Sequence, residues 1–206
     1  KDYDEAFKCF EKSQLNLKYE DCNPKIYLDY IHTYRKNLDQ KAFSAHNKKT
    51  KLFKNSPVFL IGFPRSGTTL LDTILRSHPE IDVLEEKPII NSVEQIIKTK
   101  FNCSLDELHK LSTNDLDFLR IKYLENLKNN SDRKKNAEKL IDKFPFQTAC
   151  LPLINLLFPK SKIIFAHRHP YDTVLSCFQQ TFEPNYAMAN LRSINSASEI
   201  YDLTMS

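Results

Sequence analysis

Both glycines of this 206-residue chain, Gly62 and Gly67, lie in one stretch, residues 59–70. Because glycine allows tight turns and close approach of the backbone to a ligand, this stretch is predicted to be a ligand-binding turn. The apolar residues 57–61 predict a buried parallel strand before the turn, and the helical spacing of apolar residues in 68–75 predicts a helix after it. Unpaired N–H groups and the positive end of the helix dipole would favour an anion at this point.

The spacing of the two glycines is that of a phosphate-binding loop with one departure. Thr68 stands where loops that bind nucleoside triphosphates carry a lysine. Since that lysine reaches the terminal phosphates, its absence argues against hydrolysis of ATP or GTP and leaves the anion cradle in place. Arg65 supplies a cation that binds an oxyanion through two N–H groups. A glycine-capped turn without a ligand is the simpler alternative, but the added arginine and hydroxyl side chains favour an anion site.

A second motif spans residues 162–177. Its apolar residues 163–166 predict a short strand, so that Arg168 follows the carboxyl end of a strand, where open α/β sheets bind ligands. Ser176 lies two turns into the helix that follows and could share one phosphate with Arg168. The alternative is an ordinary surface salt bridge between Arg168 and Asp172, which would contribute little.

Together these motifs resemble the sulfotransferase family. The loop residues 64–70, the segment 77–80 and the pair Glu85–Glu86 are similar to its tyrosylprotein branch and to bacterial members with tetratricopeptide repeats before the catalytic domain. The 162–177 motif is similar to the second family element and follows in the same order. The resemblance implies a donor, 3′-phosphoadenosine 5′-phosphosulfate (PAPS), adenosine 3′,5′-bisphosphate (PAP) as product, and no metal.

The resemblance also assigns residues to the two ends of the donor. Those expected to hold the 5′-phosphosulfate are Arg65, Ser66, Gly67, Thr68, Thr69 and Leu70. The 3′-phosphate is expected on Arg168 and Ser176. The tyrosylprotein branch has another basic residue four positions after this serine, where this chain has Gln180, so that the grip on the 3′-phosphate is weaker or comes from elsewhere.

Three residues are predicted to carry the chemistry, which is an in-line transfer of a sulfonate group to an acceptor hydroxyl. Glu86 occupies the position of the catalytic base in the tyrosylprotein branch, although Glu85 and Glu86 would also suit the start of a helix near residue 88. Lys143 matches the lysine that assists the departing nucleotide, although it could equally be a surface charge. Arg65 would hold the transferred group. Protein tyrosines, saccharides, lipids and small molecules all stay open as acceptors.

Alternating strands and helices predict an α/β fold with a three-layer α/β/α arrangement around a parallel sheet. We expect a helical segment at 1–46 that resembles the end of a tetratricopeptide-repeat array, a linker at 47–56 and a sulfotransferase domain at 57–206 that is incomplete at its C-terminal end. Residues 88–136 are expected to form a helical cap inserted beside the sheet. The third strand is expected at 140–143.

Composition narrows the function further. Thirty basic and 26 acidic side chains give a net charge of +4, which suits anionic ligands, and no basic run interleaved with aromatic residues points to nucleic acid. No apolar stretch is long enough to span a bilayer. Five scattered cysteines predict a reducing, cytoplasmic setting. His167 and His169 lack further ligands at metal-binding spacing.

Two other functions are left open by the sequence. A nucleotide or small-molecule kinase with a phosphate-binding loop would need the missing loop lysine and a metal-binding carboxylate, for which Asp142 is a weak candidate. A non-catalytic interaction module would instead use the helical repeats and retain only a vestigial anion site.

Overall fold

A computed structural model describes residues 2–38, 56–131 and 137–206 of the chain. Four strands occur in this part, β1 (Val58–Gly62), β2 (Ile81–Glu85), β3 (Lys139–Lys143) and β4 (Ile163–Ala166). The α-helices are α1 (Tyr3–Asn16), α2 (Lys25–Leu38), α4 (Thr68–Arg76), α5 (Ile89–Lys100), α6 (Thr113–Asn129), α7 (Leu151–Leu157), α8 (Pro170–Phe178) and α9 (Ile194–Met205). Short 3₁₀ helices occur at Leu108–Lys110, Pro145–Cys150 and Met188–Leu191.

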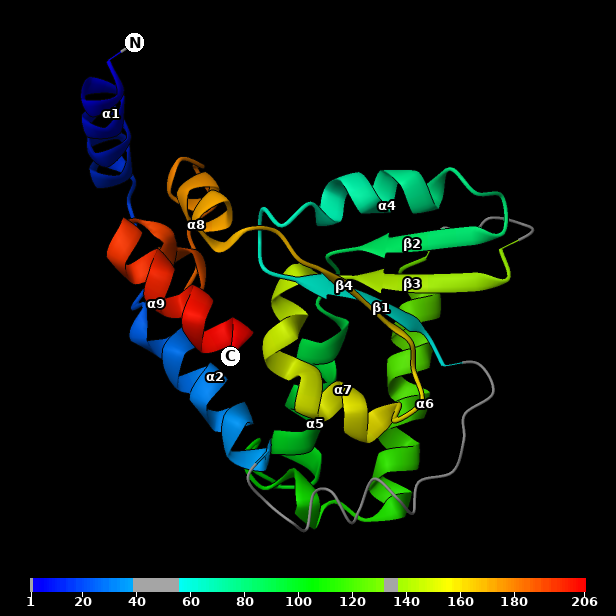
Figure 1. Cartoon of the computed structure of the whole chain (residues 1–206). Coiled ribbons are helices and arrows are strands. Elements are labelled where there is room, and N and C mark those ends of the chain that lie inside the picture. Colours follow the sequence, from blue (N-terminus) through cyan, green and yellow to red (C-terminus); the bar gives the residue numbers. More distant parts are fainter. Residues whose placement is uncertain (1, 39–55, 132–136) are drawn as a thin grey trace.

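The strands form one parallel sheet in the order β2-β3-β1-β4. Figure 1 shows α4 on one face of this sheet and α5, α6 and α7 on the other. From the central strand β1 the chain passes through α4 to the edge strand β2. It then crosses back in the opposite direction, through α5 and α6 to β3 and through α7 to β4. Because right-handed crossovers in opposite directions place their helices on opposite faces, both faces of the sheet are covered. The predicted three-layer α/β/α fold is therefore confirmed.

The central strand β1 explains why both faces of the sheet need a cover. Phe59 and Ile61 are completely buried on the side of α5, α6 and α7, whereas Leu60 is completely buried on the other side, in a smaller cluster with Val83 and Ile141. Successive side chains of a strand point to opposite faces, so an uninterrupted apolar run places apolar groups in two separate cores.

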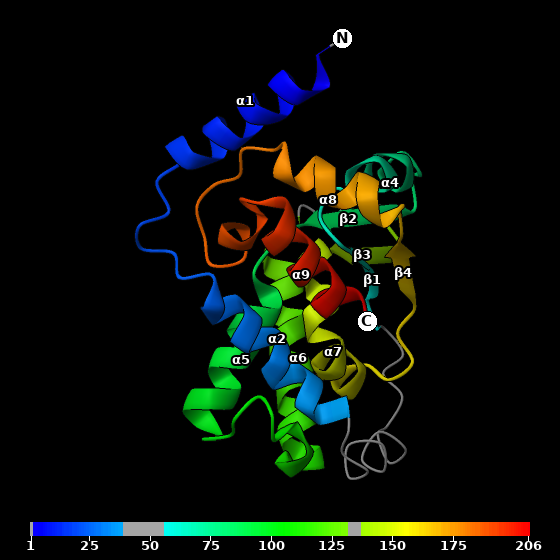
Figure 2. The same ribbon diagram turned by 60° about the vertical axis from the view of Figure 1, so that its left-hand side comes forward.

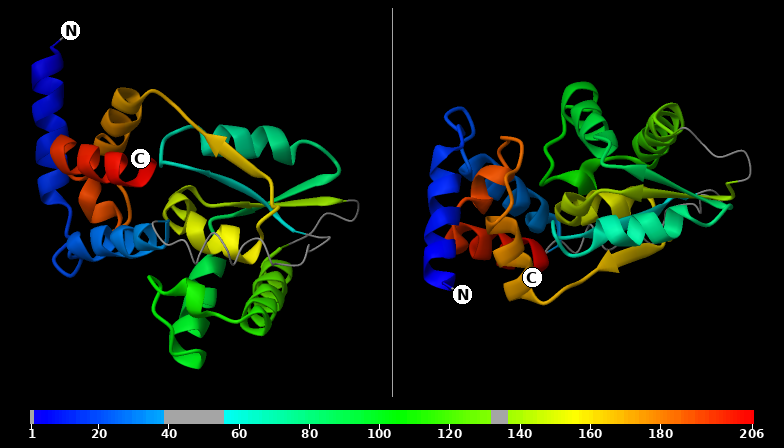
Figure 3. Two further views of the ribbon diagram at one scale, coloured as in Figure 1. Left: turned by 60° about the horizontal axis from the view of Figure 1, so that its bottom comes forward. Right: turned by 90° about the horizontal axis from the view of Figure 1, so that it is seen from above.

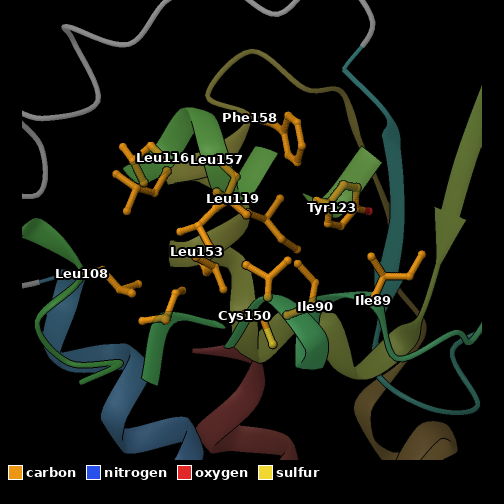
Figure 4. Packing of buried hydrophobic residues seen from close by; sticks show 14 of the residues in the cluster. Ile89, Ile90, Leu108, Leu116, Leu119, Tyr123, Cys150, Leu153, Leu157 and Phe158 are labelled. Carbon is orange, nitrogen blue, oxygen red and sulfur yellow. The ribbon is translucent and has the colours of Figure 1, made fainter. Parts of the chain in front are cut away.

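The prediction that residues 88–136 form a cap inserted beside the sheet is wrong. Helices α5 and α6 form a layer of the domain itself, and their apolar side chains make up much of the larger core. Figure 4 shows Leu119 of α6 and Leu153 of α7 meeting in this core, with Tyr123 toward the sheet. A capping box between Ser112 and Asp115 fixes the start of α6. Part of the polar loop expected after α6, residues 132–136, lies outside the described residues.

The N-terminal region is helical, as predicted, and α1 packs partly as its spacing predicts. Of the face formed by Ala6, Phe7, Phe10 and Ser13, Phe7 and Phe10 contact the ring of Phe178 in α8, with centroids 5.2 and 6.5 Å apart. Ala6 and Ser13 are exposed, and Gln14 is the buried residue of α1. Figures 2 and 3 show α1 directed away from α2, while α2 lies against α7 and α9. The likeness to a tetratricopeptide repeat stays a prediction. The linker expected at 47–56 falls outside the described residues, apart from Ser56.

The carboxyl ends of all four strands lie at one edge of the sheet, because the strands are parallel. This edge faces the group of helices formed by α2, α8 and α9 (Figures 1 and 3). In open α/β sheets ligands bind at this edge. None of the helices in the described ranges is long and apolar enough to cross a membrane.

Candidate active site

The turn between β1 and α4 depends on two glycines for two different reasons. Gly67 has φ +98° and precedes the first residue of α4, and no side chain caps that helix. A side chain at Gly62 would have no space, because its Cβ would lie 2.5 Å from the carbonyl oxygen of Ala166 on the paired strand β4. The turn therefore leaves the first N–H groups of α4 available to an anion, as an uncapped helix N-terminus does.

Two further side chains, which were not predicted from the sequence, hydrogen-bond to the backbone of this turn. The Thr148 hydroxyl oxygen lies 3.1 Å from the amide nitrogen of Gly62 and 2.8 Å from its carbonyl oxygen. The Cys177 thiol donates to the carbonyl oxygen of Pro64 over 3.3 Å. Burial raises the pKa of Cys177 to about 12, against the opposing charge of Arg65, so the thiol keeps its proton at neutral pH. Neither contact has a local sequence signal, because each joins segments far apart in the chain.

The two predicted phosphate motifs meet in space. Arg65 donates through Nε to the Ser176 hydroxyl oxygen over 3.2 Å, and Arg168 donates through Nη1 to the carbonyl oxygen of Arg65 over 3.4 Å. Arg168 also lies 3.7 Å from a carboxylate oxygen of Asp172, so the alternative salt bridge exists as well. Both arginines and Ser176 thus lie at one point next to the start of α4. Two arginines beside an uncapped helix N-terminus favour a bound anion.

The remaining loop residues differ in exposure. Ser66 and Thr68 are buried, and the Ser66 hydroxyl has no hydrogen-bond partner among the described residues. Thr69 and Leu70 are exposed on the first turn of α4. All the residues predicted for the phosphosulfate therefore belong to a single turn, and those predicted for the 3′-phosphate lie beside it.

The second half of the site lies at the ends of β3 and β2, the two strands on one side of β1. Lys143, at the end of β3, donates to a carboxylate oxygen of Glu85 over 2.9 Å and to one of Glu86 over 2.7 Å. The side chain of Lys143 is 1% exposed, and the two carboxylates are about half exposed. Lys143 is therefore no surface charge. No side chain caps α5, so neither glutamate takes the helix-capping role that the sequence also allowed.

The pKa values of Lys143 and Glu85 are shifted within this cluster. Burial acts to lower the pKa of Lys143, but its hydrogen bonds to Glu86 and Glu85 outweigh burial and raise that pKa. The hydrogen bond from Lys143 lowers the pKa of Glu85. Glu86 has φ +49°, in the left-handed region, and its amide nitrogen donates to the carbonyl oxygen of Lys143 over 2.8 Å. Such a conformation is uncommon for a residue other than glycine, and here it turns the chain sharply at the end of β2.

Asp142 does not suit the role of a metal-binding carboxylate at a nucleotide. It is completely buried, and one carboxylate oxygen accepts hydrogen bonds from the Tyr123 hydroxyl and, over 3.2 Å, from Gln147 Nε2. Burial raises the pKa of Asp142 to about 6, against these two hydrogen bonds. Across the described ranges, no three metal-ligating side chains of the His, Cys, Asp or Glu type come together.

A cavity of about 540 Å³ opens beside Glu86. Its walls come from α2, from the start of α5, from residues 144–150 and from residues 185–188. No local pattern predicts this cavity, because its walls belong to four segments of the chain that meet only after folding. The single local signal is the spacing of Tyr27 and Tyr30, one helical turn apart in α2.

Comparison with known proteins gives a match to one family model and to curated relatives. Residues 57–205 match the family model described as "Sulfotransferase family". Over 152 residues the chain is 32% identical to protein-tyrosine sulfotransferase 1 of Rattus norvegicus, covering 71% of this chain and 38% of the rat protein. The corresponding protein of Homo sapiens is 32% identical over 142 residues, which are 66% of this chain and 36% of the human protein.

A relative of uncharacterized function in Aquifex aeolicus is 27% identical over 193 residues, or 88% of this chain and 24% of that protein. The chain thus spans less than two fifths of the length of each of these relatives. The matched residues 57–205 include both predicted phosphate motifs and the cluster around Lys143. The chain belongs to the sulfotransferase family.

Proposed function

We propose that the protein transfers a sulfonate group from PAPS to the hydroxyl group of an acceptor. The observation that carries this proposal is the meeting of Arg65, Ser176 and Arg168 beside the uncapped first turn of α4. One end of the donor would lie on the N–H groups of that turn with Arg65. Its 3′-phosphate would bind Arg168 and Ser176. Membership of the family and the names of the rat and human relatives support the same reaction.

The cluster at the ends of β2 and β3 would carry the chemistry. Glu86 accepts the proton of the acceptor hydroxyl while the acceptor oxygen forms a new bond to sulfur. The bond between sulfur and the bridging oxygen breaks, and PAP leaves with the electron pair. Lys143 stabilises the charge that grows on this oxygen, and Arg65 with the hydroxyl groups of Thr68 and Thr69 stabilises the sulfonate oxygens. Positioning and charge stabilisation supply the rate, as in phosphoryl transfer.

The sheet explains why the two halves lie near each other. Leu60 of β1 pairs in register with Lys143 of β3, and the phosphate loop starts two residues after Leu60. The order β2-β3-β1-β4 sets Glu86, Lys143, the loop and Arg168 in sequence along one edge. Because some relatives are named protein-tyrosine sulfotransferases, a phenolic hydroxyl is the first acceptor to test.

Calorimetry with PAP tests the donor site. Arg65→Ala and Arg168→Ala should each weaken the binding of PAP at least tenfold, about 1.4 kcal/mol, because each removes charge-assisted hydrogen bonds to phosphate. Lys98→Ala removes one positive charge from an exposed position of α5 and should leave the affinity unchanged. Undiminished affinity in both arginine variants would contradict the proposal, and binding of ATP without binding of PAP would favour a kinase.

A further inference from the structure

The cavity beside Glu86 has a lining that is aromatic and nearly uncharged. Five of its lining side chains are aromatic, namely Tyr27, Tyr30, Phe144, Phe146 and Tyr186. Of the described residues that line it, Glu86 is the one that carries a charge. Lys143, the cation that contacts Glu86, is already shared by two carboxylates. A cavity of this kind favours a flat, uncharged molecule and disfavours an anion, whose burial near Glu86 would have no compensating cation.

Two polar atoms in the cavity wall lack a partner. The Gln147 side chain is 3% exposed and uses its Nε2 for Asp142, while its Oε1 has no hydrogen-bond partner among the described residues. The hydroxyl of Tyr27 is also buried without a partner there. Buried polar atoms are rarely left unpaired, because an unpaired one costs about 1–3 kcal/mol. Both atoms are enclosed in the protein, so they lie behind the lining and are not contacts offered to a ligand in the cavity.

Helix α2 forms a fixed wall of this cavity, although it lies before the residues 57–205 that match the family. Tyr30 and Tyr34 of α2 both donate to one carboxylate oxygen of the buried Glu94 in α5, over 2.5 and 2.6 Å. Tyr27 stacks on Tyr30 with ring centroids 5.5 Å apart and meets Phe146 edge-on at 5.3 Å. These contacts join α2 to the domain and set the aromatic rings in place before a ligand binds.

We propose that α2 is part of the acceptor site and that the acceptor is an uncharged aromatic hydroxyl compound. Its ring lies against Tyr27 and Phe146, and its hydroxyl reaches Glu86. This inference rests on the proposed sulfonate transfer, because Glu86 serves as the base of that reaction. It adds the preference for an uncharged acceptor and assigns the selection of the acceptor to a helix outside the family match.

A pair of isosteric acceptors tests the charge preference. We use 4-hydroxyphenylacetamide, which is neutral and carries an N–H donor, and 4-hydroxyphenylacetate, which carries a carboxylate at the same place. With saturating PAPS, kcat/KM for the amide should exceed that for the carboxylate at least tenfold, mainly through KM. Equal values, or a preference for the carboxylate, would overturn the proposal.

Variants of α2 test the location. Ile26 lines the cavity and is 47% exposed, whereas Ile121 of α6 is 49% exposed and does not line it. Ile26→Lys should reduce the preference for the amide at least tenfold by adding a cation for the carboxylate, and Ile121→Lys should not change it. Tyr27→Ala should raise KM for the amide. An unchanged preference in Ile26→Lys would overturn the role of α2.

Binding of PAP, measured by calorimetry in each variant, separates the two proposals. Unchanged affinity for PAP shows that the donor site is intact, so that a missing effect on the acceptor contradicts this inference alone. Absence of PAP binding in the unmodified protein would instead contradict the sulfonate transfer on which the inference rests. Because Ile26 is partly exposed, Ile26→Lys still tests whether α2 contacts the acceptor even if Tyr27→Ala fails to fold.

Discussion

The Nζ atom of Lys143 lies 2.7 Å from a carboxylate oxygen of Glu86, and the same ammonium group also binds Glu85. The lysine is buried and both carboxylates are partly exposed, so the cation is held from inside the protein and the carboxylates face outward. A buried charge is tolerated when it is paired in this way. The cluster therefore joins the proposed general base and the proposed cation for the leaving group in one structure.

The two glutamates allow a matched test of catalysis. Glu86→Gln should lower kcat by about 10²–10⁴-fold, because it removes the proton acceptor while keeping the size of the side chain. Glu85→Gln removes the other carboxylate on Lys143 and should have a much smaller effect. Steady-state kinetics with PAPS and a phenol measures both, and PAP calorimetry verifies the donor site. Equal losses of kcat would show that neither carboxylate acts as the base.

Gly62 is predicted to be irreplaceable for reasons of space. Gly62→Ala puts a methyl group against the carbonyl oxygen of Ala166, so that β4 or the phosphate loop has to move. We expect a loss of about 1–3 kcal/mol in the free energy of unfolding, measured with denaturant, together with weaker PAP binding. Gly67→Asn is the comparison, because a side chain there meets no atom within 4 Å and asparagine tolerates positive φ. A larger loss at Gly67 than at Gly62 would contradict this explanation.

Asp142 should make stability depend on pH. Its folded pKa of about 6 lies above its ordinary value of 3.8, since burial disfavours the charged form. Between pH 3.8 and pH 6 Asp142 is ionised in the unfolded chain but still protonated in the folded protein, so the free energy of unfolding falls as pH rises. Above pH 6 the loss reaches its full value, about 3 kcal/mol. Asp142→Asn lacks this titration.

The free energy of unfolding of Asp142→Asn, minus that of the unmodified protein, should therefore increase from pH 4 to pH 7. Urea unfolding at a series of pH values gives this difference. Comparing the two proteins removes the contributions of the other titrating groups, which they share. A difference that stays constant over this range would show that Asp142 titrates with an ordinary pKa.

Much of the fold could be predicted from local patterns. The apolar runs of β1 and β4, the helix after the phosphate loop and Pro170 at the start of α8 lie where the sequence placed them. The place of α5 and α6 could not be predicted, because helical periodicity shows that a face is buried but not what covers it. In α1 the same periodicity identified Phe7 and Phe10, which contact Phe178, but it did not identify Gln14 as the buried residue.

The sequence by itself determined the glycine turn between a strand and a helix. It also singled out the arginine and serine of the second motif and the pair of glutamates as candidate site residues, because each belongs to a short motif whose spacing is tied to local backbone geometry. Only the tertiary structure decided that Arg65 meets Ser176, that Lys143 is buried between two carboxylates and that α2 forms a wall of the cavity. These contacts join residues far apart in the chain. They depend on the strand order and on packing, which no local spacing specifies.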